Sequence, residues 1–513
     1  MIYGIIDAVE FVTGVFVMLY LSKSLYCGTV QCPKILWMRK NMPDRYDDSV
    51  LNEAALSMGN EVGDLAMGLF GEFREVPYVE GDLTPMINMT REWLAEGVPV
   101  IAEASFVHDG AFCSVDILVN KGGGDVELYE VKSTTHVKDI HYHDVAYQYH
   151  VLESVGLRVG KACIVNVNNK YTRRGALDLH ELFVINDVTE RIREMQPGVA
   201  AQVDMLKKYM KQQEEPEHEI GEHCFSPYDC GYFGWCSRAL PKPNVFDLSG
   251  MQLRTKMKHF RNGVVSFAQL EAEKSVKGNY RLQIEHELYD VPDSVDAGEI
   301  RKFTETLSFP LYFLDFESFQ PAVPLYDGTR PFQQIVFQYS LHYILREGGE
   351  AGHREFLAYP GDDPRRALAE RLCEDIPAGA CVTAYNMTFE KSRIKELAGL
   401  YPDLAEHLMS IHDNIVDLMV PFRNKWYYNR AMHGSYSVKY VLPALFPDDP
   451  ALDYHNLDGV HNGAEASAAF ENMARMDAAE LEKYREHLLR YCELDTLALV
   501  KIWEKLTDAA AGR

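Results

Sequence analysis

The chain has 513 residues, of which 47% are hydrophobic and 25% charged, and it carries a formal net charge of -25 at pH 7. This length exceeds what one hydrophobic core normally supports, so we expect two domains and a connector. The composition is that of a globular protein. The negative charge excludes a chain coated with basic residues for unspecific nucleic-acid binding, but it allows acidic metal sites and a locally basic groove.

The amino-terminal stretch is apolar, but Asp7 and Glu10 interrupt it and no basic residue opens it. Its uninterrupted part, Phe11 to Leu21, has about half the length of a membrane span. We therefore expect no transmembrane helix, no signal peptide and a cytoplasmic protein. Because the sequence reads as a natural beginning from Met18, residues 1–17 are expected to be a non-native or dispensable extension; the alternative is a genuine but dispensable helix.

The 10 cysteines of a chain without a secretory signal indicate a reducing compartment, where clustered cysteines bind metals more often than they form disulfides. Cys224, Cys230 and Cys236 are separated from one another by five residues each, and Cys27 and Cys32 lie far upstream. One upstream thiolate would complete a four-sulfur site for zinc or an iron–sulfur cluster, and the spacing does not choose between these cofactors. Buried cysteines without a ligand are the alternative.

A second group of candidate residues lies between those cysteines. The segment AFCSVDILVN is predicted to be a strand that carries Asp116, KGGGD a turn, and VELYEVKSTT a strand with Glu130 and Lys132 on one face. Two carboxylates can hold Mg²⁺ or Mn²⁺, and a lysine can stabilise or help deprotonate an attacking water. A solvated strand face is the alternative interpretation.

With these motifs, residues 18–240 resemble a RecB-type PD-(D/E)XK nuclease with a cysteine-ligated 4Fe-4S cluster, as in AddB and the CRISPR-associated RecB-like exonucleases. The resemblance implies a restriction-endonuclease-like fold with Asp116, Glu130 and Lys132 in its active site. It also implies one cluster ligand before the nuclease core and three after it. Cys32, in the context QCPK, matches the leading ligand better than Cys27, and the other three ligands are Cys224, Cys230 and Cys236.

The surroundings of this motif depart from the family pattern. The helix SMGNEVGDLAMGLF lacks the histidine often found there, and Glu61 is the substitute that we expect to support the site. Gln148, in HDVAYQYHVLE, matches the glutamine of the following helix, whereas Leu152 replaces the usual tyrosine. We expect Glu61 and Gln148 to support the site, with a surface carboxylate as the alternative for Glu61.

Residues 241–305 are predicted to be a helical, locally basic connector. Arg254 to Arg281 contains seven Lys or Arg and two Glu, with three aromatic residues between them: Phe260, Phe267 and Tyr280. Such a segment can follow a phosphate backbone. A helical linker packed on one side is the alternative.

The second half is organised around LYFLDFESF, in which Asp315 and Glu317 are two residues apart. In a strand these carboxylates face the same side, and the apolar composition predicts a buried strand. Burying two like charges is costly unless a cation lies between them, so we expect a divalent metal there.

Two further motifs follow along the chain. VTAYNMTFEKSRI predicts a strand that runs into a helix and places Asn386 and Glu390 in an N-x-x-F-E frame, and near it Asp417 is expected to be a positioning residue. HLLRYCELDTLALVKIW has helical periodicity, with Tyr491 and Asp495 on one face.

This order resembles the DnaQ-like exonucleases of the DEDDy subclass, so residues 306–513 are expected to adopt an RNase H-like fold. The resemblance implies catalytic roles for Asp315, Glu317, Glu390, Tyr491 and Asp495, with Asp315, Glu317 and Asp495 as metal ligands and Tyr491 orienting the attacking water. Glu390 stands where most members have Asp, which leaves its ligand geometry open.

The segments GSYSVKYVLPALFPDD and LDYHNLDG resemble an uncharacterised bacterial family, known only as a domain of unknown function, that carries these DEDD-like residues. We expect Tyr436, Ser437 and Lys439 to contact a substrate phosphate, with a structural loop as the alternative.

The sequence thus predicts an α/β protein with mixed sheets flanked by helices: a PD-(D/E)XK domain fused to a DEDDy domain. We expect a Mg²⁺- or Mn²⁺-dependent exonuclease that acts on DNA with a free end or a single strand, in repair or defence. Two alternatives remain: a nucleic-acid-binding protein in which one or both sites no longer cut, and a structural protein with zinc in place of the 4Fe-4S cluster.

Overall fold

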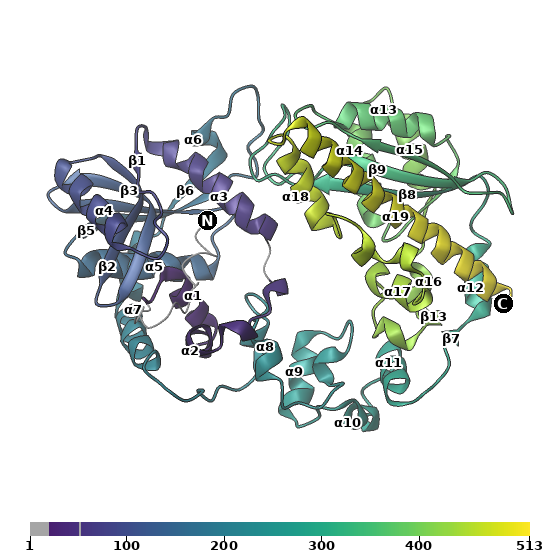
Figure 1. Ribbon diagram of the computed structural model, residues 1–513, viewed down its shortest axis with the longest axis horizontal. Coiled ribbons are helices and arrows are strands. Elements are labelled where there is room, and N and C mark those ends of the chain that lie inside the picture. Colours follow the sequence, from purple (N-terminus) through teal and green to yellow (C-terminus); the bar gives the residue numbers. More distant parts are fainter. Residues whose placement is uncertain (1–19, 51–52) are drawn as a thin grey trace. The chain divides into compact units, whose positions relative to one another are not determined.

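The computed structural model describes residues 20–50 and 53–513, so the predicted extension 1–17 lies outside the described residues. The chain folds into two compact units. Unit 1 comprises the described residues up to Ala239 together with Pro321–Gln333, and unit 2 comprises Leu240–Gln320 and Gln334–Arg513. Both contain a mixed sheet flanked by helices, which confirms the predicted α/β class (Figure 1).

Unit 1 is built on a six-stranded sheet in the order β1-β2-β3-β4-β5-β6. Its strands are β1 (Arg74–Glu75), β2 (Val100–His108), β3 (Ala111–Gly122), β4 (Asp125–Lys132), β5 (Arg158–Val167) and β6 (Phe183–Asp187). Its helices of eight or more residues are α1 (Lys23–Gln31), α2 (Lys34–Asn41), α3 (Glu53–Ala66), α4 (Thr84–Glu96), α5 (Asp139–Ser154) and α7 (Thr189–Tyr209); α6 (Leu179–Leu182) and α8 (Phe233–Cys236) are single turns. The pairs β2–β3, β3–β4 and β5–β6 are antiparallel, whereas β1–β2 and β4–β5 are parallel.

The central hairpin of unit 1 is formed by the two strands that the sequence predicts. The glycines of the turn, Gly122, Gly123 and Gly124, all have positive φ, which only glycine adopts at low cost. In the β3–β4 register Ile117 pairs with Tyr129, which sets the next two residues, Asp116 and Glu130, side by side. Helix α5 follows β4 and packs on the sheet.

Unit 2 contains a five-stranded sheet in the order β10-β9-β8-β11-β12. Its strands are β8 (Leu311–Phe319), β9 (Ile335–Ile344), β10 (Gly352–Leu357), β11 (Cys381–Ala384) and β12 (Ile415–Asp417), and β7 (Ser294–Val295) pairs separately with β13 (Tyr427–Tyr428). Its main helices are α13 (Arg365–Asp375), α14 (Thr388–Leu400), α15 (Ala405–Asp413), α17 (Val438–Leu445), α18 (Gly463–Met473) and α19 (Ala478–Ala510), and α16 (Val420–Arg423) is one turn.

Strand β8 lies at the centre of this sheet, antiparallel to β9 and parallel to β11. The long helix α19 runs along β8 and β9, as Figure 1 shows. The segment Leu311–Phe319 is therefore the buried strand that its composition predicts, with apolar residues such as Phe313 and Leu314 fully inaccessible.

The predicted connector belongs to unit 2 and contains α9 (Leu253–Arg261), α10 (Phe267–Ala272), α11 (Asn279–Leu288) and α12 (Ala297–Thr304). Phe267 is buried in a small core, and Phe260 and Tyr280 pack against it. These aromatic side chains hold helices together, which agrees with the packed-linker alternative. Basic side chains such as Arg254, Lys258 and Lys274 remain exposed.

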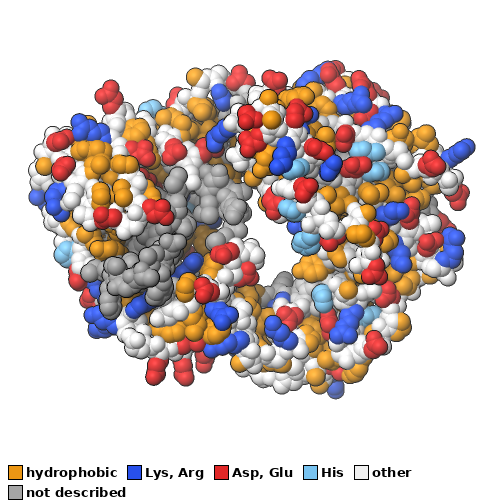
Figure 2. Space-filling model, in the orientation of Figure 1, with side chains coloured by type: hydrophobic (Ala, Val, Ile, Leu, Met, Phe, Trp, Pro, Cys, Tyr) orange, Lys and Arg blue, Asp and Glu red, His pale blue; other side chains and the backbone are white. Residues whose placement is uncertain are grey.

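Within the described residues, no helix combines the length and hydrophobicity needed to cross a membrane. Acidic and basic side chains are interspersed over the visible faces of both units (Figure 2).

Candidate functional site

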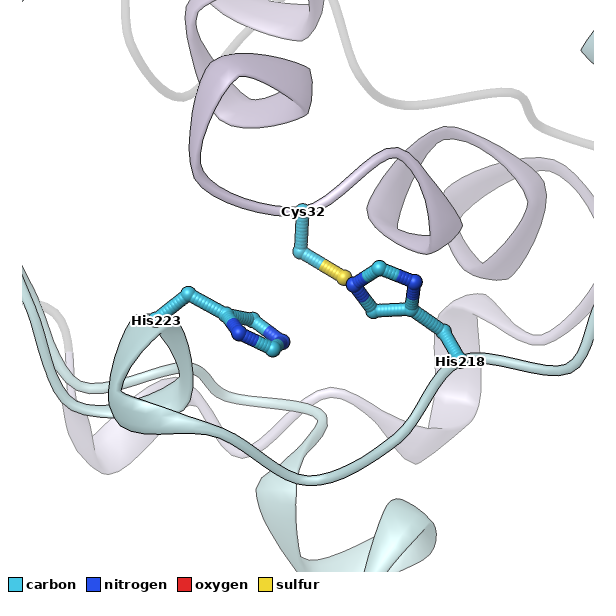
Figure 3. Close-up of side chains that lie close together, drawn as sticks. All are labelled: Cys32, His218 and His223. Atoms are coloured by element: carbon cyan, nitrogen blue, oxygen red, sulfur yellow. The ribbon is translucent and has the colours of Figure 1, made fainter.

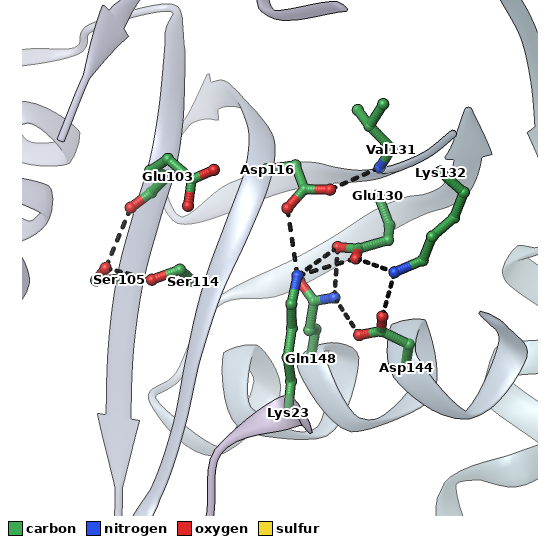
Figure 4. Close-up of polar contacts among 10 residues, drawn as sticks. All are labelled: Lys23, Glu103, Ser105, Ser114, Asp116, Glu130, Val131, Lys132, Asp144 and Gln148. Atoms are coloured by element: carbon green, nitrogen blue, oxygen red, sulfur yellow. Dashed lines mark hydrogen bonds and ion pairs between the residues drawn. The ribbon is translucent and has the colours of Figure 1, made fainter. Parts of the chain in front are cut away.

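Unit 1 brings the predicted residues Asp116, Glu130, Lys132 and Gln148 into one hydrogen-bonded cluster (Figure 4). The Lys132 Nζ donates to Glu130 Oε1 at 2.6 Å and to Asp144 Oδ2 at 2.5 Å. The Gln148 Nε2 donates to Glu130 Oε2 at 2.6 Å and to Asp144 Oδ1 at 2.9 Å. The second oxygen of Asp116 accepts the backbone N–H of Val131 at 2.7 Å. Lys132 and Gln148 therefore hold Glu130 in place directly, whereas Asp116 is fixed by the backbone of β4.

Two members of this cluster, Lys23 and Asp144, and the nearby carboxyl of Glu103 are absent from the sequence prediction. Lys23, at the start of α1, places its Nζ 3.2 Å from Asp116 Oδ1 and 2.9 Å from Glu130 Oε1. Asp144 lies one helical turn before Gln148 on α5. This i, i+4 spacing places the two side chains on one face of the helix, so the sequence alone could have identified Asp144. Glu103 on β2 lies beside Asp116 in the β2–β3 register, and burial, reinforced by Asp116, raises its pKa to about 8.

A divalent ion does not fit between Asp116 and Glu130 while Lys23 lies there. The Lys23 ammonium is buried and already occupies the position between the two carboxylates. Burial lowers the pKa of Lys23, but Asp116, Glu130 and Asp144 together raise it well above its ordinary value, so this lysine is charged at neutral pH. Glu61 is exposed on α3, a helix that packs on β4.

Unit 2 brings together Asp315 and Glu317 from β8 and Asp495 from α19. Each offers one carboxylate oxygen, and these oxygens all lie within 4.8 Å of one another. In the described part of the chain, no ion pair joins any of them to a lysine or arginine. These residues fit a divalent ion, because hard cations bind clustered carboxylate oxygens.

The electrostatics of unit 2 reflect the burial of several carboxyl groups close together. Burial and the neighbouring carboxylates raise the pKa of Asp315 and of Glu317 well above their ordinary values. Burial also raises the pKa of Asp495 to about 7, although the hydroxyls of Tyr454 and Tyr491 act in the opposite direction. Metal ligation would relieve the repulsion that these shifts record.

Glu390 lies buried in the first turn of α14, and its Oε2 accepts no hydrogen bond from the described residues. Burial raises its pKa to about 8. Before this helix, Asn386 has a φ of 66°, and its backbone N–H donates to Asp417 Oδ1 at 2.9 Å. Asp417 also accepts the N–H of Met419 at 3.0 Å. Asp417 thus fixes the turn after β11, in agreement with its predicted positioning role.

Two tyrosines contact the carboxylates of unit 2. Burial and the nearby carboxylates raise the pKa of Tyr491 far above its ordinary value, so its hydroxyl keeps its proton. Tyr454, which sequence reasoning missed, donates to Asp495 Oδ1 at 2.6 Å. Lys439 is exposed on α17 and lowers the pKa of Asp495, which places its charge near the site. The adjacent Tyr436 and Tyr440 are also exposed.

The four predicted cysteine ligands, Cys32, Cys224, Cys230 and Cys236, line one cavity of about 20 Å³ in unit 1, and Cys27 does not line it. His218 and His223 line it too, and their rings lie next to the Cys32 thiol (Figure 3). Ligand atoms of Cys32, His218 and His223 lie within 4.8 Å of one another, which fits one metal ion.

Comparisons with known proteins agree with the unknown-function bacterial family. Residues 312–437 match a domain of unknown function, DUF2779. The chain is 26% identical over 235 residues to an uncharacterized protein of Ureaplasma parvum, UU173, covering 40% of this chain and 33% of that protein. It is 24% identical over 391 residues to the uncharacterized protein MG366 of Mycoplasma genitalium, covering 66% of this chain and 57% of the relative.

The uncharacterized MG366 homolog of Mycoplasma pneumoniae is 27% identical over 212 residues, which cover 37% of this chain and 31% of that protein. The chain thus spans less than two thirds of the length of each of these relatives. No solved structure matches it.

Proposed function

We propose that this protein is a metal-dependent nuclease that hydrolyses phosphodiester bonds, with DNA bearing a free end or a single strand as its preferred substrate. The observation that carries the proposal is the close group of Asp315, Glu317 and Asp495, whose carboxylate oxygens lie within 4.8 Å of one another. The resemblance of unit 2 to DEDDy exonucleases, and with it the RNase H-like fold, is part of the proposal. Repair or defence is the proposed setting by resemblance alone.

In this reaction a water oxygen forms a bond to phosphorus, one ester P–O bond breaks, and the leaving oxygen takes up a proton. A divalent ion held by the three carboxylates would supply Lewis acidity and a more acidic water. The protonated Tyr491 hydroxyl is available to orient the attacking water. Lys439 is placed to attract the phosphate backbone, and the exposed rings of Tyr436 and Tyr440 offer surfaces on which bases stack.

For unit 1 the proposal includes a PD-(D/E)XK-type domain, supported by the β3–β4 hairpin with Asp116 and Glu130 and by Lys132. Because Lys23 lies between the carboxylates, we derive no cleavage step there. The same observation favours a second candidate function for this unit, in which it binds nucleic acid without cutting it. Cleavage by unit 1 therefore has to be tested separately from cleavage by unit 2.

The cysteine cavity is proposed to hold a structural metal group. The resemblance favours a 4Fe-4S cluster on Cys32, Cys224, Cys230 and Cys236. The two histidines beside Cys32 favour the alternative, a single zinc ion. Metal analysis of anaerobically purified protein decides between them: iron with a brown colour supports the cluster, and stoichiometric zinc in colourless protein supports the ion.

The nuclease proposal is tested with end-labelled single- and double-stranded DNA and RNA in Mg²⁺ or Mn²⁺. We expect Asp315→Ala to slow one cleavage activity about a hundredfold or more, roughly 3 kcal/mol of transition-state stabilisation. Glu374→Gln, an exposed carboxylate on α13, is the matched control and should cut at the wild-type rate. If wild type cuts none of the four substrates with either ion, the proposal is wrong.

A further inference from the structure

Lys23 is held in unit 1 by the backbone that precedes it. The N–H of Leu21 donates to Gly110 O at 2.8 Å, and its carbonyl accepts the N–H of Phe112 at 3.0 Å and the hydroxyl of Tyr147. Ser22 then caps helix α1 by accepting the N–H of Leu25 at 3.2 Å. Since Leu21 is bridged to the start of β3, the first turn of α1 has a defined position beside β3 and β4.

From that position the Lys23 side chain reaches two carboxylates on neighbouring strands. Its Nζ lies 3.2 Å from Asp116 Oδ1 and 2.9 and 3.1 Å from the two oxygens of Glu130 (Figure 4). Lys23 is only 5% exposed, and Glu130 is 1% exposed. A buried ammonium is tolerated only with charged partners of this kind. Lys23 therefore contacts both carboxylates that a divalent ion would need.

The balance of charges makes the lysine and a divalent ion alternatives. Asp116, Glu130 and Asp144 contribute three negative charges, and Lys23 and Lys132 contribute two positive charges. Glu103, whose pKa is raised to about 8, is mostly protonated at neutral pH, so one net negative charge remains. Lys23 and Lys132 already contact Glu130, so a divalent ion added without removing Lys23 would be a third cation against this carboxylate. It would also change the net charge of the buried cluster from negative to positive. The Lys23 ammonium thus already fills the position between Asp116 and Glu130 and balances their charge.

We propose that Lys23 is the built-in cation of unit 1: its ammonium replaces a divalent ion between Asp116 and Glu130, and removing the ammonium creates a divalent-metal site. The inference rests on the proposed function only for its choice of ion. The inference assigns a role to a residue about 90 positions upstream of Asp116. If Lys23 only stabilised the fold, its removal would not change metal binding by Asp116 and Glu130.

The test counts Mn²⁺ ions bound to the full chain by electron paramagnetic resonance of free Mn²⁺. Asp315→Asn with Glu317→Gln removes two ligands of unit 2, and this double variant is the parent. We expect the parent to bind no Mn²⁺ through Glu130. Adding Glu130→Gln should therefore leave the number of Mn²⁺ ions bound per chain unchanged. A Mn²⁺ ion bound by the parent and lost with Glu130→Gln would overturn the proposal, whatever the other variants do.

Two substitutions of Lys23 in this parent complete the test. Lys23→Met removes the charge but keeps much of the side-chain length, whereas Lys23→Arg keeps the charge. We expect Lys23→Met to bind one additional Mn²⁺ per chain, with an affinity at least tenfold higher than that of Lys23→Arg. Adding Glu130→Gln to Lys23→Met should abolish the gain. A folded Lys23→Met chain that gains no Mn²⁺ would also overturn the proposal.

Thermal unfolding gives a second readout, because an ion that binds only the folded chain raises its midpoint. We expect Lys23→Met to melt below the parent without ions and to be restored by Mn²⁺, while Lys23→Arg does not respond. Equal responses of the two variants contradict the proposal. None of these readouts requires cleavage, so a chain that cuts nothing would refute the proposed function and still decide the role of Lys23.

Discussion

The two carboxylate sites of this protein both bury like-charged groups, but they differ in what lies next to those groups. In unit 1, Glu130 accepts hydrogen bonds from Lys23, Lys132 and Gln148, so its charge is compensated by the chain itself. In unit 2, Asp315, Glu317 and Asp495 face one another, and burial together with mutual repulsion raises the pKa of Asp315 and of Glu317. The carboxylates of the first site contact lysines, whereas within the described residues those of the second form no ion pair with a lysine or arginine.

This difference shows that a motif of acidic residues does not by itself identify a metal site. Both units present two carboxylates on a buried strand or strand pair, and both resemble nuclease motifs. What separates the units is whether a lysine from elsewhere in the chain reaches the carboxylates. The following predictions test this contrast.

The largest effect is expected on stability in buffer without divalent ions at pH 8. Glu130→Gln leaves Lys23 and Lys132 buried without their shared carboxylate, and we expect a loss of about 3–5 kcal/mol in the free energy of unfolding. Asp315→Asn removes a charge that the folded state disfavours, so its stability should equal or exceed that of wild type. Urea denaturation measures both, with Glu374→Gln within about 0.5 kcal/mol of wild type as control. Equal losses at Glu130 and Asp315 would contradict the contrast.

Buried carboxyl groups should make the stability of both units depend on pH, with more such groups in unit 2 than in unit 1. The folded-state pKa of Asp495 is raised from 3.8 to about 7 and that of Glu390 from 4.5 to about 8. The folded chain therefore binds more protons than the unfolded chain between about pH 4 and 8, and the stability of unit 2 should fall as the pH rises through this window. In unit 1 the pKa of Glu103 is likewise raised from 4.5 to about 8, so this residue adds to the same fall in stability. The raised pKa of Lys23 keeps the contribution of this lysine constant up to its ordinary value of 10.5.

Thermal unfolding between pH 5.5 and 8.5, with and without Mn²⁺, checks this prediction. Mn²⁺ has to displace the protons bound to the carboxyl groups of unit 2. The rise in the unfolding midpoint temperature on adding Mn²⁺ should therefore increase with pH. Asp315→Asn should lose most of this gain. A gain that is the same at both ends of the range would contradict the shifted pKa values.

The smallest effect is expected from Tyr454→Phe, which removes the hydrogen bond to Asp495 and leaves the ring in place. Partners of metal ligands typically contribute about tenfold or more to affinity, so Mn²⁺ binding to unit 2 should weaken about tenfold. The hydrogen bond also lowers the pKa of Asp495, so the pH of half-maximal binding should move upward. Tyr440→Phe, an exposed tyrosine, serves as control, and an unchanged pH profile in Tyr454→Phe would exclude this positioning role.

Much of the local structure follows from the sequence alone. Alternating apolar residues with Gly122–Gly124 between them specify the β3–β4 hairpin, and the aromatic run Leu311–Phe319 specifies a buried strand, because side-chain spacing along a strand is a local property. The spacing of Tyr491 and Asp495 likewise places both on one face of α19. These rules act over a few residues, so they identified the strands, the helices and most of the acidic residues.

Only the tertiary structure decided which charges meet. Lys23 reaches Glu130 across 107 positions of the chain, and Tyr454 reaches Asp495 across 41. Likewise His218 and His223 lie next to Cys32 although they are far from it in sequence. No local periodicity encodes such encounters, because they depend on how strands and helices pack. The sequence therefore determined where the carboxylates are, and the packing decided that Asp116 and Glu130 contact a lysine while Asp315, Glu317 and Asp495 lie close to one another.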